Sequence, residues 1–318
     1  MSIRSSVFQA ISRRTIKRNG LDKEQTVRHL RKVFNNPPTL RLIPRGVKVR
    51  NIDLPEFKGE LVSTKSPEVT VLYLHGGAFV AGLTRTYHNF ASRLAKQLNA
   101  EVFLATYPFA PESPFPAAQK RCFEAYKYLL SLDKRPENIV IAGDSAGGGL
   151  TLVCLLQIRD QSLPLPRCAV AMSPGTVATL DEDKLRIDCP KDSMLSADFV
   201  KQIIDIYLPN QKDRDHPYAS PGLANYKGIP PLLLTASKDE ILYHDVCKAK
   251  ANALKAGVKV EWIERSGVGH VWPVMVPFLP EANQDLKKIV DFIQRAAPKE
   301  QDKAPQLNTP NALVHCAI

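Results

Sequence analysis

The 318-residue sequence lacks several features that would assign it to a protein class at once. It contains no run of about 18 apolar residues, so we expect no helix that spans a membrane. Its first residues form no continuous apolar stretch of the kind found in a secretory signal peptide, so no export signal is expected. It also has no zinc-finger spacing, no heptads and no basic segment interleaved with aromatic residues, which argues against a nucleic-acid-binding protein.

Cysteine is scarce and scattered. The six cysteines form no CxxC pair, and several lie in apolar runs such as residues 152–156, where a reduced thiol behaves as a small hydrophobic side chain. A disulfide framework is not expected at this length and spacing. These features predict a reducing compartment, and we expect a cytoplasmic protein.

Negative charge is the scarcer sign. Asp and Glu number 32 against 43 Lys and Arg, so the formal net charge is +11. Basic residues are concentrated early, in residues 12–18 (SRRTIKR) and 28–32 (RHLRK). Such an excess favours weak attraction to anions, but we interpret both segments as solvated helix faces. We expect no nucleic-acid partner and no stable membrane insertion, and the sequence leaves a homodimer open.

Short β-branched runs alternate with helical stretches along most of the chain. Helical segments separate the later strand candidates, at residues 87–98, 117–131, 147–160, 244–256 and 281–295. Apolar strands alternating with helices predict an α/β fold, with a mostly parallel eight-stranded sheet flanked by helices. The two earliest strands lack an intervening helix and are compatible with antiparallel pairing. The predicted strands begin at Val47, Gly59, Val69, Glu101, Asn138, Ala169, Pro231 and Val258.

Two regions interrupt the alternation. Residues 1–45 are predicted as helices that end at the breaker NNPPTL, and residues 176–225 as charged loops around one helix with Ser196 at its N-cap. Both are expected to fold over the strand ends as a cap. The chain is thus divided into cap helices (1–45), a core in two parts (46–175 and 226–297), a cap insertion (176–225) and a polar tail (298–318) expected to be disordered.

The segment NIVIAGDSAGGGL, residues 138–150, contains the pattern G-x-S-x-G between a predicted strand and a predicted helix. Gly143 and Gly147 allow Ser145 to lie on a tight turn with its hydroxyl exposed. The N-terminus of the following helix favours negative charge that develops nearby. The alternative, a phosphate-binding loop, is disfavoured because neither GxGxxG nor GxxxxGK[ST] is present. Ser145 is therefore predicted to be a nucleophile.

A serine hydroxyl becomes a strong nucleophile only when a base accepts its proton. In a fold with this motif the acid and then the histidine follow the serine. His270 lies in a glycine-containing loop after the last predicted strand and is predicted to be the base. Asp239, immediately after the strand PLLLTAS, is predicted to be the acid, and Glu240 and Asp245 are the adjacent alternatives.

The segment HGGAFVAG, residues 75–82, follows the predicted strand from Val69. Paired glycines by themselves indicate a tight turn. Attack on an ester, however, creates an oxyanion that needs backbone N–H donors about 3 Å away. With a nucleophile predicted at Ser145, we interpret residues 75–77 as a loop that approaches the oxyanion, and Ala146 as a further N–H donor.

Six segments occur in a familiar order: HGGAF, YPFAPESPFPAA, GDSAGGG, DHPYASP, TASKDE and GHVW. Over residues 45–296 the chain resembles the hormone-sensitive-lipase-like (family IV) esterases of the α/β-hydrolase superfamily. The resemblance implies that Gly77, Ala78 and Ala146 supply the N–H groups of an oxyanion hole. It also implies that His75 and Gly76 support the loop and that a helical cap covers the site.

The sequence departs from the family pattern at three places. Ala78 replaces a glycine but keeps its backbone N–H, Pro108 replaces an arginine whose ion pair is expected to be missing, and residues 175–177 lack the usual aromatic residue and aspartate.

These observations predict a serine carboxylesterase that forms an acyl-enzyme on short- to medium-chain esters, without cofactor or metal. Its expected partner is a small-molecule ester. Alternatives are a lactone or arylformamide hydrolase with the same triad, or a non-catalytic receptor, against which His270 argues. The predicted substrate pocket consists of Phe79, Val80, Ile203, Ile206 and Tyr207.

Overall fold

The computed structural model describes residues 2–17, 20–35, 40–54, 58–176 and 191–297. Its strands form one eight-stranded sheet in the order β1-β2-β4-β3-β5-β6-β7-β8. The first two junctions, β1 with β2 and β2 with β4, are antiparallel, and every later one is parallel. The predicted mostly parallel sheet is confirmed. The strands are β1 (Lys48–Asp53), β2 (Lys58–Ser63), β3 (Val69–Leu74), β4 (Ala100–Ala105), β5 (Ile139–Asp144), β6 (Cys168–Met172), β7 (Leu232–Ser237) and β8 (Val260–Arg265).

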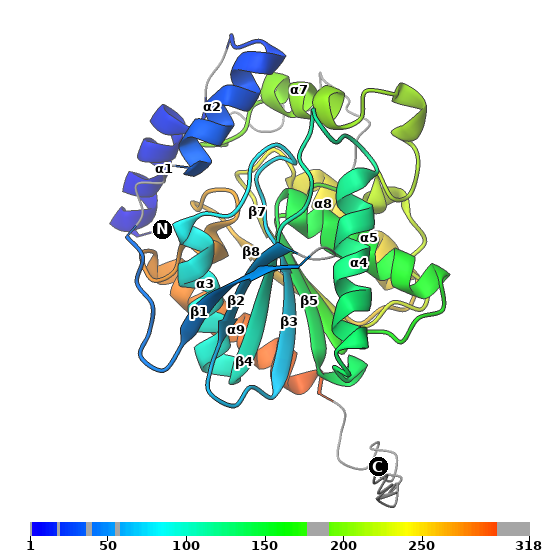
Figure 1. The fold of residues 1–318 in the computed structure, drawn as a ribbon. Helices are drawn as coiled ribbons and strands as arrows, with labels where there is room; N and C mark the ends of the chain where they lie inside the picture. Colours follow the sequence, from blue (N-terminus) through cyan, green and yellow to red (C-terminus); the bar gives the residue numbers. More distant parts are fainter. Residues whose placement is uncertain (1, 18–19, 36–39, 55–57, 177–190, 298–318) are drawn as a thin grey trace, which may run out of the picture.

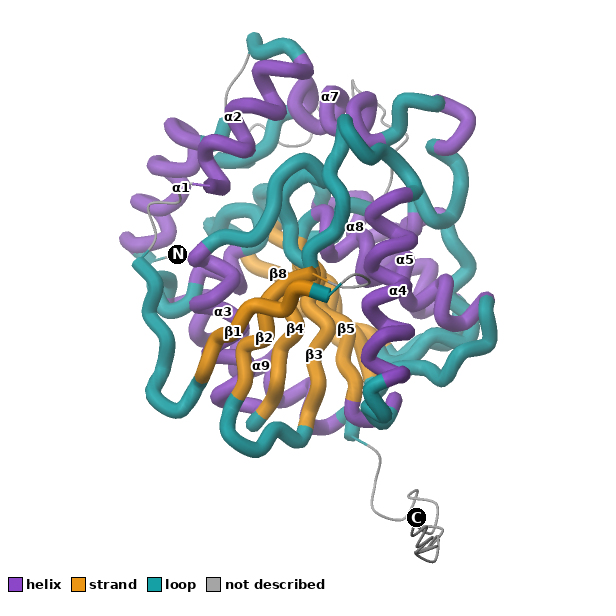
Figure 2. The backbone as a smooth tube through the Cα atoms, viewed as in Figure 1, coloured by secondary structure: helices purple, strands orange, loops and turns teal. Residues whose placement is uncertain are grey.

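Helices cover both faces of the sheet. In Figure 1, α4 and α5 lie in front of one face, and α3 and α9 lie against the other. The tube view in Figure 2 shows the strands enclosed between these two layers. None of the helices in the described ranges has the length and apolar character needed to cross a membrane. The helices are α1 (Ile3–Thr15), α2 (Lys23–Asn35), α3 (Arg85–Leu98), α4 (Ala117–Ser131), α5 (Ala146–Asp160), α7 (Ala197–Tyr207), α8 (Tyr243–Lys255) and α9 (Pro280–Arg295).

The central strands are buried on both faces, which explains their continuous apolar sequences. Alternate residues of β3 contribute to different cores: Leu72 and Leu74 pack in the core with α4 and α5, and Val71 and Tyr73 pack in the core with α3 and α9. All four side chains are fully buried. Because side chains alternate across a strand, a strand between two helical layers must be apolar at every position. This pattern holds the carboxyl end of β3 rigidly beside that of β5.

Helices α1, α2 and α7 lie together above the strand ends, although nearly 200 residues separate α1 from α7 (Figure 1). The Thr26 hydroxyl donates to Gln202 Oε1 over 2.6 Å, and Gln202 Nε2 donates to the Leu21 carbonyl over 2.7 Å. Lys23 pairs with Asp205 at 3.2 Å. These contacts join α2 to α7, so the N-terminal helices and the insertion helix form one layer, as a cap would require.

Local capping explains where two of these helices begin. Ser196 caps α7 by accepting a hydrogen bond from the Phe199 N–H over 3.3 Å, as predicted. Before α2, the Asp22 side chain accepts from the Gln25 N–H and the Gln25 side chain accepts from the Asp22 N–H, which is a capping box. Residues 177–190 of the predicted insertion and the predicted tail, 298–318, lie outside the described residues.

Candidate active site

Ser145 lies at the sharp turn between β5 and α5, with φ 52° and ψ −121°. A positive φ is costly for serine and persists only where the surroundings enforce it. A Cβ atom at Gly143 would lie 2.3 Å from the Gly147 carbonyl oxygen, and one at Gly147 would lie 1.9 Å from the Leu74 carbonyl oxygen. Glycine is therefore required at both positions, and the strand–turn–helix context predicted for Ser145 is confirmed.

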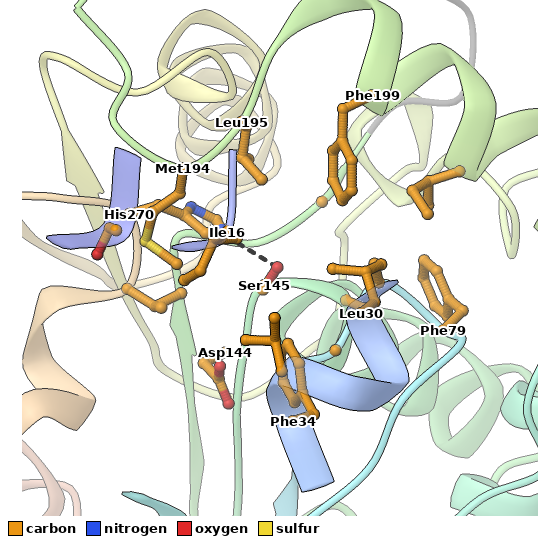
Figure 3. A pocket seen from close by; sticks show the side chains of 18 of the residues that line it. Ile16, Leu30, Phe34, Phe79, Asp144, Ser145, Met194, Leu195, Phe199 and His270 are labelled. Atoms are coloured by element: carbon orange, nitrogen blue, oxygen red, sulfur yellow. Dashed lines mark hydrogen bonds between the residues drawn. The ribbon is translucent and has the colours of Figure 1, made fainter. Parts of the chain in front are cut away.

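His270 lies between Ser145 and a carboxylate. Its Nε2 is 2.8 Å from Ser145 Oγ, and its Nδ1 is 2.5 Å from Glu240 Oε2. His270 and Glu240 are almost completely buried. Figure 3 shows the contact between Ser145 and His270 within the cavity. The three side chains form one hydrogen-bonded line, which is the arrangement that activates a serine hydroxyl.

The carboxylate beside His270 is Glu240 and not Asp239, which corrects the sequence prediction. After β7 the chain turns so that the Glu240 N–H donates to the Ser237 carbonyl over 3.2 Å, and Glu240 Oε1 accepts from the Ser237 N–H over 2.9 Å. This turn directs Glu240 inward. Asp239 instead accepts from the Gly267 N–H over 2.5 Å and so holds the loop that leads to His270. Asp245, in the first turn of α8, contacts Lys248.

The surroundings of His270 favour its protonated form. Burial by itself lowers the pKa of His270, but the hydrogen bond and the charge of Glu240 outweigh it, so the pKa is raised above 6.5. A base with a raised pKa accepts the serine proton more readily, and Glu240 stabilises the imidazolium that results.

A second buried carboxylate, Asp192, braces this side of the site. Asp192 Oδ1 accepts from the Met194 and Leu195 N–H groups over 2.8 and 2.9 Å, and Oδ2 accepts from the Ile241 N–H over 2.9 Å. It thereby connects the insertion to the turn that carries Glu240. The sequence reasoning missed Asp192, because an acidic residue in a charged loop gives no signal of burial.

The loop after β3 has an unusual backbone. Gly77, Ala78 and Phe79 have φ values of 124°, 54° and 60°. The Gly77 carbonyl accepts hydrogen bonds from the N–H groups of Val80 and Ala81, each over 3.0 Å. A Cβ atom at Gly77 would lie 2.3 Å from the Ala81 oxygen, so only glycine fits there. The loop therefore turns back tightly after Gly77, beside the cavity that Ser145 lines.

The predicted oxyanion residues Gly77, Ala78 and Ala146 line the same cavity as Ser145 and His270. Ala78, which stands where the family has glycine, adopts the left-handed conformation in spite of its Cβ. Its backbone N–H is retained.

His75 lies beneath this loop and is fully buried. Its ring stacks on Tyr107 with centroids 4.4 Å apart, and its Nδ1 is 2.7 Å from the Gly76 carbonyl oxygen. Burial lowers the pKa of His75 to about 4, so the ring is neutral at pH 7. These contacts support the expectation that His75 braces the loop.

Asp144 connects the oxyanion loop to the nucleophile turn, and the sequence reasoning gave it no role. Its Oδ1 accepts from the Gly76 N–H over 3.0 Å and from the Tyr73 hydroxyl over 2.8 Å. Its Oδ2 accepts from the Tyr87 hydroxyl over 3.1 Å. Burial raises the pKa of Asp144 to about 6, and these hydrogen bonds oppose the rise. Its position between Gly143 and Ser145 in the G-x-S-x-G pattern is the feature of the sequence that could have indicated a role in the site.

Arg31 of α2 forms an ion pair beside the loop after β3. It binds both oxygens of Glu112 at 2.8 and 2.6 Å. The hydrogen bond from Arg31 lowers the pKa of Glu112 to about 2. Arg31 Nε also donates to the Val80 carbonyl over 3.0 Å. The interpretation of residues 28–32 as a purely solvated face is therefore wrong at Arg31, which fastens α2 to the oxyanion loop.

A cavity of about 810 Å³ opens beside Ser145. Of the predicted pocket residues, Phe79, Ile203 and Tyr207 line it, and Phe79 stacks on Tyr207 with centroids 3.7 Å apart. Val80 and Ile206 do not line it, because both side chains pack in the core below the cap. Figure 3 shows further apolar residues around the Ser145 hydroxyl. Phe199 extends the predicted apolar stripe of α7 by one turn, and the sequence reasoning missed Ile16, Leu30, Phe34, Met194 and Leu195.

Within the described ranges, no group of three or more His, Cys, Asp and Glu side chains is arranged to hold a metal ion.

Comparisons with known proteins identify the family. A family model for the alpha/beta hydrolase fold matches residues 71–274. An acetyl-hydrolase from Streptomyces hygroscopicus is 34% identical over 227 residues, which cover 71% of this chain and 76% of that protein. An esterase from Acinetobacter venetianus is 31% identical over 255 residues, which cover 79% of this chain and 84% of that protein.

A solved structure, that of an esterase from the bacterial hormone-sensitive lipase family, has a TM-score of 0.84 at 27% identity and covers 94% of this chain and 99% of its own. The parallel sheet and the serine turn at its edge define the class of α/β hydrolases. The chain belongs to this family, among the hormone-sensitive-lipase-like esterases, and the resemblance of its motifs is confirmed.

Proposed function

We propose that the protein, a carboxylic ester hydrolase by its family, cleaves short- to medium-chain esters through an acyl-enzyme on Ser145. The observation that carries the proposal is the line of hydrogen bonds from Ser145 through His270 to Glu240. Ser145, at one end of this line, borders an apolar cavity, and the loop with Gly77 and Ala78 borders the same cavity. A nucleophile, a base, an orienting carboxylate and N–H donors are the parts that acyl transfer requires.

The first half of the reaction forms the acyl-enzyme. His270 Nε2 accepts the proton of Ser145 as Oγ attacks the ester carbonyl carbon. The N–H groups of Gly77, Ala78 and Ala146 stabilise the oxyanion of the tetrahedral intermediate. The intermediate collapses as the imidazolium, held by Glu240, gives its proton to the departing alkoxide, and the alcohol leaves.

The second half releases the acid. His270, neutral again, accepts a proton from a water molecule that attacks the acyl carbonyl. A second tetrahedral intermediate uses the same N–H donors, and its collapse returns the proton to Ser145 Oγ. Each step needs only groups of this chain, the ester and water.

Labelling with a fluorophosphonate probe tests the proposal. The probe should modify Ser145 alone, as mapped by mass spectrometry of the peptides. Ser145→Ala should abolish labelling, and His270→Ala should slow it by several orders of magnitude, because the residues act as a unit. Modification at another serine, or ester hydrolysis that survives Ser145→Ala, would overturn the assignment.

We also propose that the protein functions in a reducing compartment such as the cytoplasm. In the described part of the chain the thiols of Cys122, Cys154, Cys168 and Cys247 are free, and the first three are buried. Burial raises the pKa of Cys154, so this thiol stays protonated and acts as a small apolar side chain.

A further inference from the structure

Helix α1 is packed with its polar face inward. Ser5 and Ser12 are buried, at 1% and 2% exposure. The Ser5 hydroxyl donates to Glu281 Oε2 over 2.9 Å, and the Ser2 N–H donates to Glu281 Oε1 over 2.6 Å. The Gln9 side-chain amide donates to the Gly267 carbonyl over 2.8 Å. Hydrogen bonds therefore fix this helix to the body of the protein along its inner face.

Three apolar residues of α1 lie on its outer face, whereas Phe8 packs against the core on the inner side. Ile3, Val7 and Ile11 follow one another at intervals of four residues and so form one stripe. Their exposed fractions are 84%, 53% and 47%. A surface helix of a globular protein normally has the opposite arrangement, with its apolar stripe toward the core. Single exposed apolar residues are common, but a stripe of β-branched side chains indicates a surface that another apolar phase covers.

Positive charge surrounds this stripe. Arg4 and Arg13 are exposed and, at about 100° per residue, lie on opposite sides of it. Arg14 shares the face of the stripe. The sequence has no acidic residue between Ser2 and Leu21. A helix with an apolar face bordered by arginine is typical of a segment that lies in the plane of an anionic lipid surface.

We propose that α1 binds the protein to the surface of an anionic lipid membrane, with Ile3, Val7 and Ile11 in the interfacial layer and the arginines at the lipid headgroups. A second copy of this chain fits the stripe less well, because its arginines would meet those of the first copy. Figure 1 shows α1 at an outer edge of the molecule, where a flat surface can reach it. Ile11 and Arg14 also line the catalytic cavity, so the bound surface lies beside the cavity mouth.

This proposal concerns binding and holds whether or not the protein hydrolyses esters. The test is cosedimentation of the full-length protein with vesicles of phosphatidylcholine alone and of phosphatidylcholine mixed equally with phosphatidylglycerol. We expect binding to the anionic vesicles to exceed binding to the neutral ones by about tenfold or more. About 0.5 M NaCl should remove most of this difference, because it screens the arginine charges.

Matched variants distinguish binding through α1 from non-specific adsorption of other exposed apolar side chains. Ile3→Ser with Val7→Ser should lower the partition coefficient by about tenfold. The control, Leu223→Ser with Leu254→Ser, removes two other exposed side chains (51% and 52% exposed) and should leave binding unchanged. Circular dichroism of each variant checks that it is folded.

Charge variants test the second half of the proposal. Arg4→Gln with Arg13→Gln should lower binding to anionic vesicles by about tenfold. Lys65→Gln with Lys259→Gln, which changes net charge equally at exposed positions elsewhere, should have a much smaller effect.

Three outcomes would overturn the proposal. The first is that the protein does not bind anionic vesicles. The second is that the Ile3/Val7 and Leu223/Leu254 variants lose vesicle binding equally. The third is that light scattering detects a soluble dimer, which the double substitution Ile3→Ser with Val7→Ser dissociates. The last result would identify the stripe as a subunit interface.

Discussion

At the residue scale, Glu240 and Asp239 are neighbours with the same charge and different contacts. Glu240 binds His270 Nδ1, and Asp239 binds the Gly267 N–H. We expect Glu240→Gln to lower kcat by roughly 10³- to 10⁴-fold, because an amide cannot stabilise the imidazolium. Asp239→Asn should lower it by less than about tenfold, since the amide oxygen still accepts from Gly267. The measurement is kcat with p-nitrophenyl butyrate at saturating concentration, and equal losses in the two variants would refute this assignment.

Also at the residue scale, Asp144 gives a prediction about pH. In the proposed mechanism the neutral form of His270 is the base, so kcat/KM should fall as pH drops through its raised pKa, which lies above 6.5. As a carboxylate Asp144 accepts three hydrogen bonds, and with a pKa of about 6 it is protonated at lower pH and must give up at least one of them. Below about pH 6 the logarithm of kcat/KM should therefore fall with a slope that approaches two.

The matched variant for this prediction is Asp144→Asn, which cannot titrate. Its profile should keep a slope of one at low pH, and its maximum should be lower by about tenfold because the oxyanion loop is held less well. The measurement is kcat/KM of both proteins from about pH 4.5 to about pH 9, which gives the slope of each profile at low pH. A slope of two that persists in the asparagine variant would assign the second proton to another group.

At the scale of elements, Arg31 joins helix α2 to the loop after β3, the proposed oxyanion loop. Arg31→Met removes the pair with Glu112 and the hydrogen bond to the Val80 carbonyl. We expect kcat/KM to fall by about tenfold, with much of the change in KM, because the cavity wall and the loop lose a shared support. The Glu112 side chain is 62% exposed, so the ion pair itself adds little to stability.

Arg28 of the same helix provides the control. Among the described residues its ion pair is with Glu24, one turn earlier, and both side chains are mostly exposed. Arg28→Met should leave kcat/KM within about twofold of the original value. If Arg28→Met and Arg31→Met have the same effect, the result reflects the charge of α2 rather than a link to the loop.

At the scale of the whole molecule, we expect the helices above the cavity to limit the length of ester that fits. The cavity of about 810 Å³ is bounded by the oxyanion loop, α2 and α7, and the Phe79–Tyr207 stack closes part of it. Each methylene that fits contributes about 0.8 kcal/mol, and carbons beyond the end of the slot contribute nothing. We expect kcat/KM for dissolved p-nitrophenyl esters to be highest at acyl lengths of about four to eight carbons.

The experiment compares acyl chains from about two to about sixteen carbons at concentrations below micelle formation. A maximum at about twelve carbons or more would contradict a bounded slot and leave the assignment of Ser145, His270 and Glu240 intact.

The sequence by itself determined the parts whose requirements are local. Strands β3 and β5 are apolar at nearly every position because both of their faces are buried. This pattern can be recognised in the sequence without the structure. The turn at Ser145 needs glycine at 143 and 147 for steric reasons that also lie within a few residues. The serine turn, the histidine loop and the glycine-rich loop were therefore predicted from sequence, and so was the sheet that positions them.

Only the tertiary structure decided which side chains meet across the chain. The turn after β7 points Glu240 rather than Asp239 at His270, and a shift of one residue in a turn leaves no trace in composition. The contacts of Arg31 with Glu112 and Val80, and the inward polar face of α1, join segments 49 or more residues apart. Such contacts depend on how rigid elements pack, and many sequences with the same local patterns would pack otherwise.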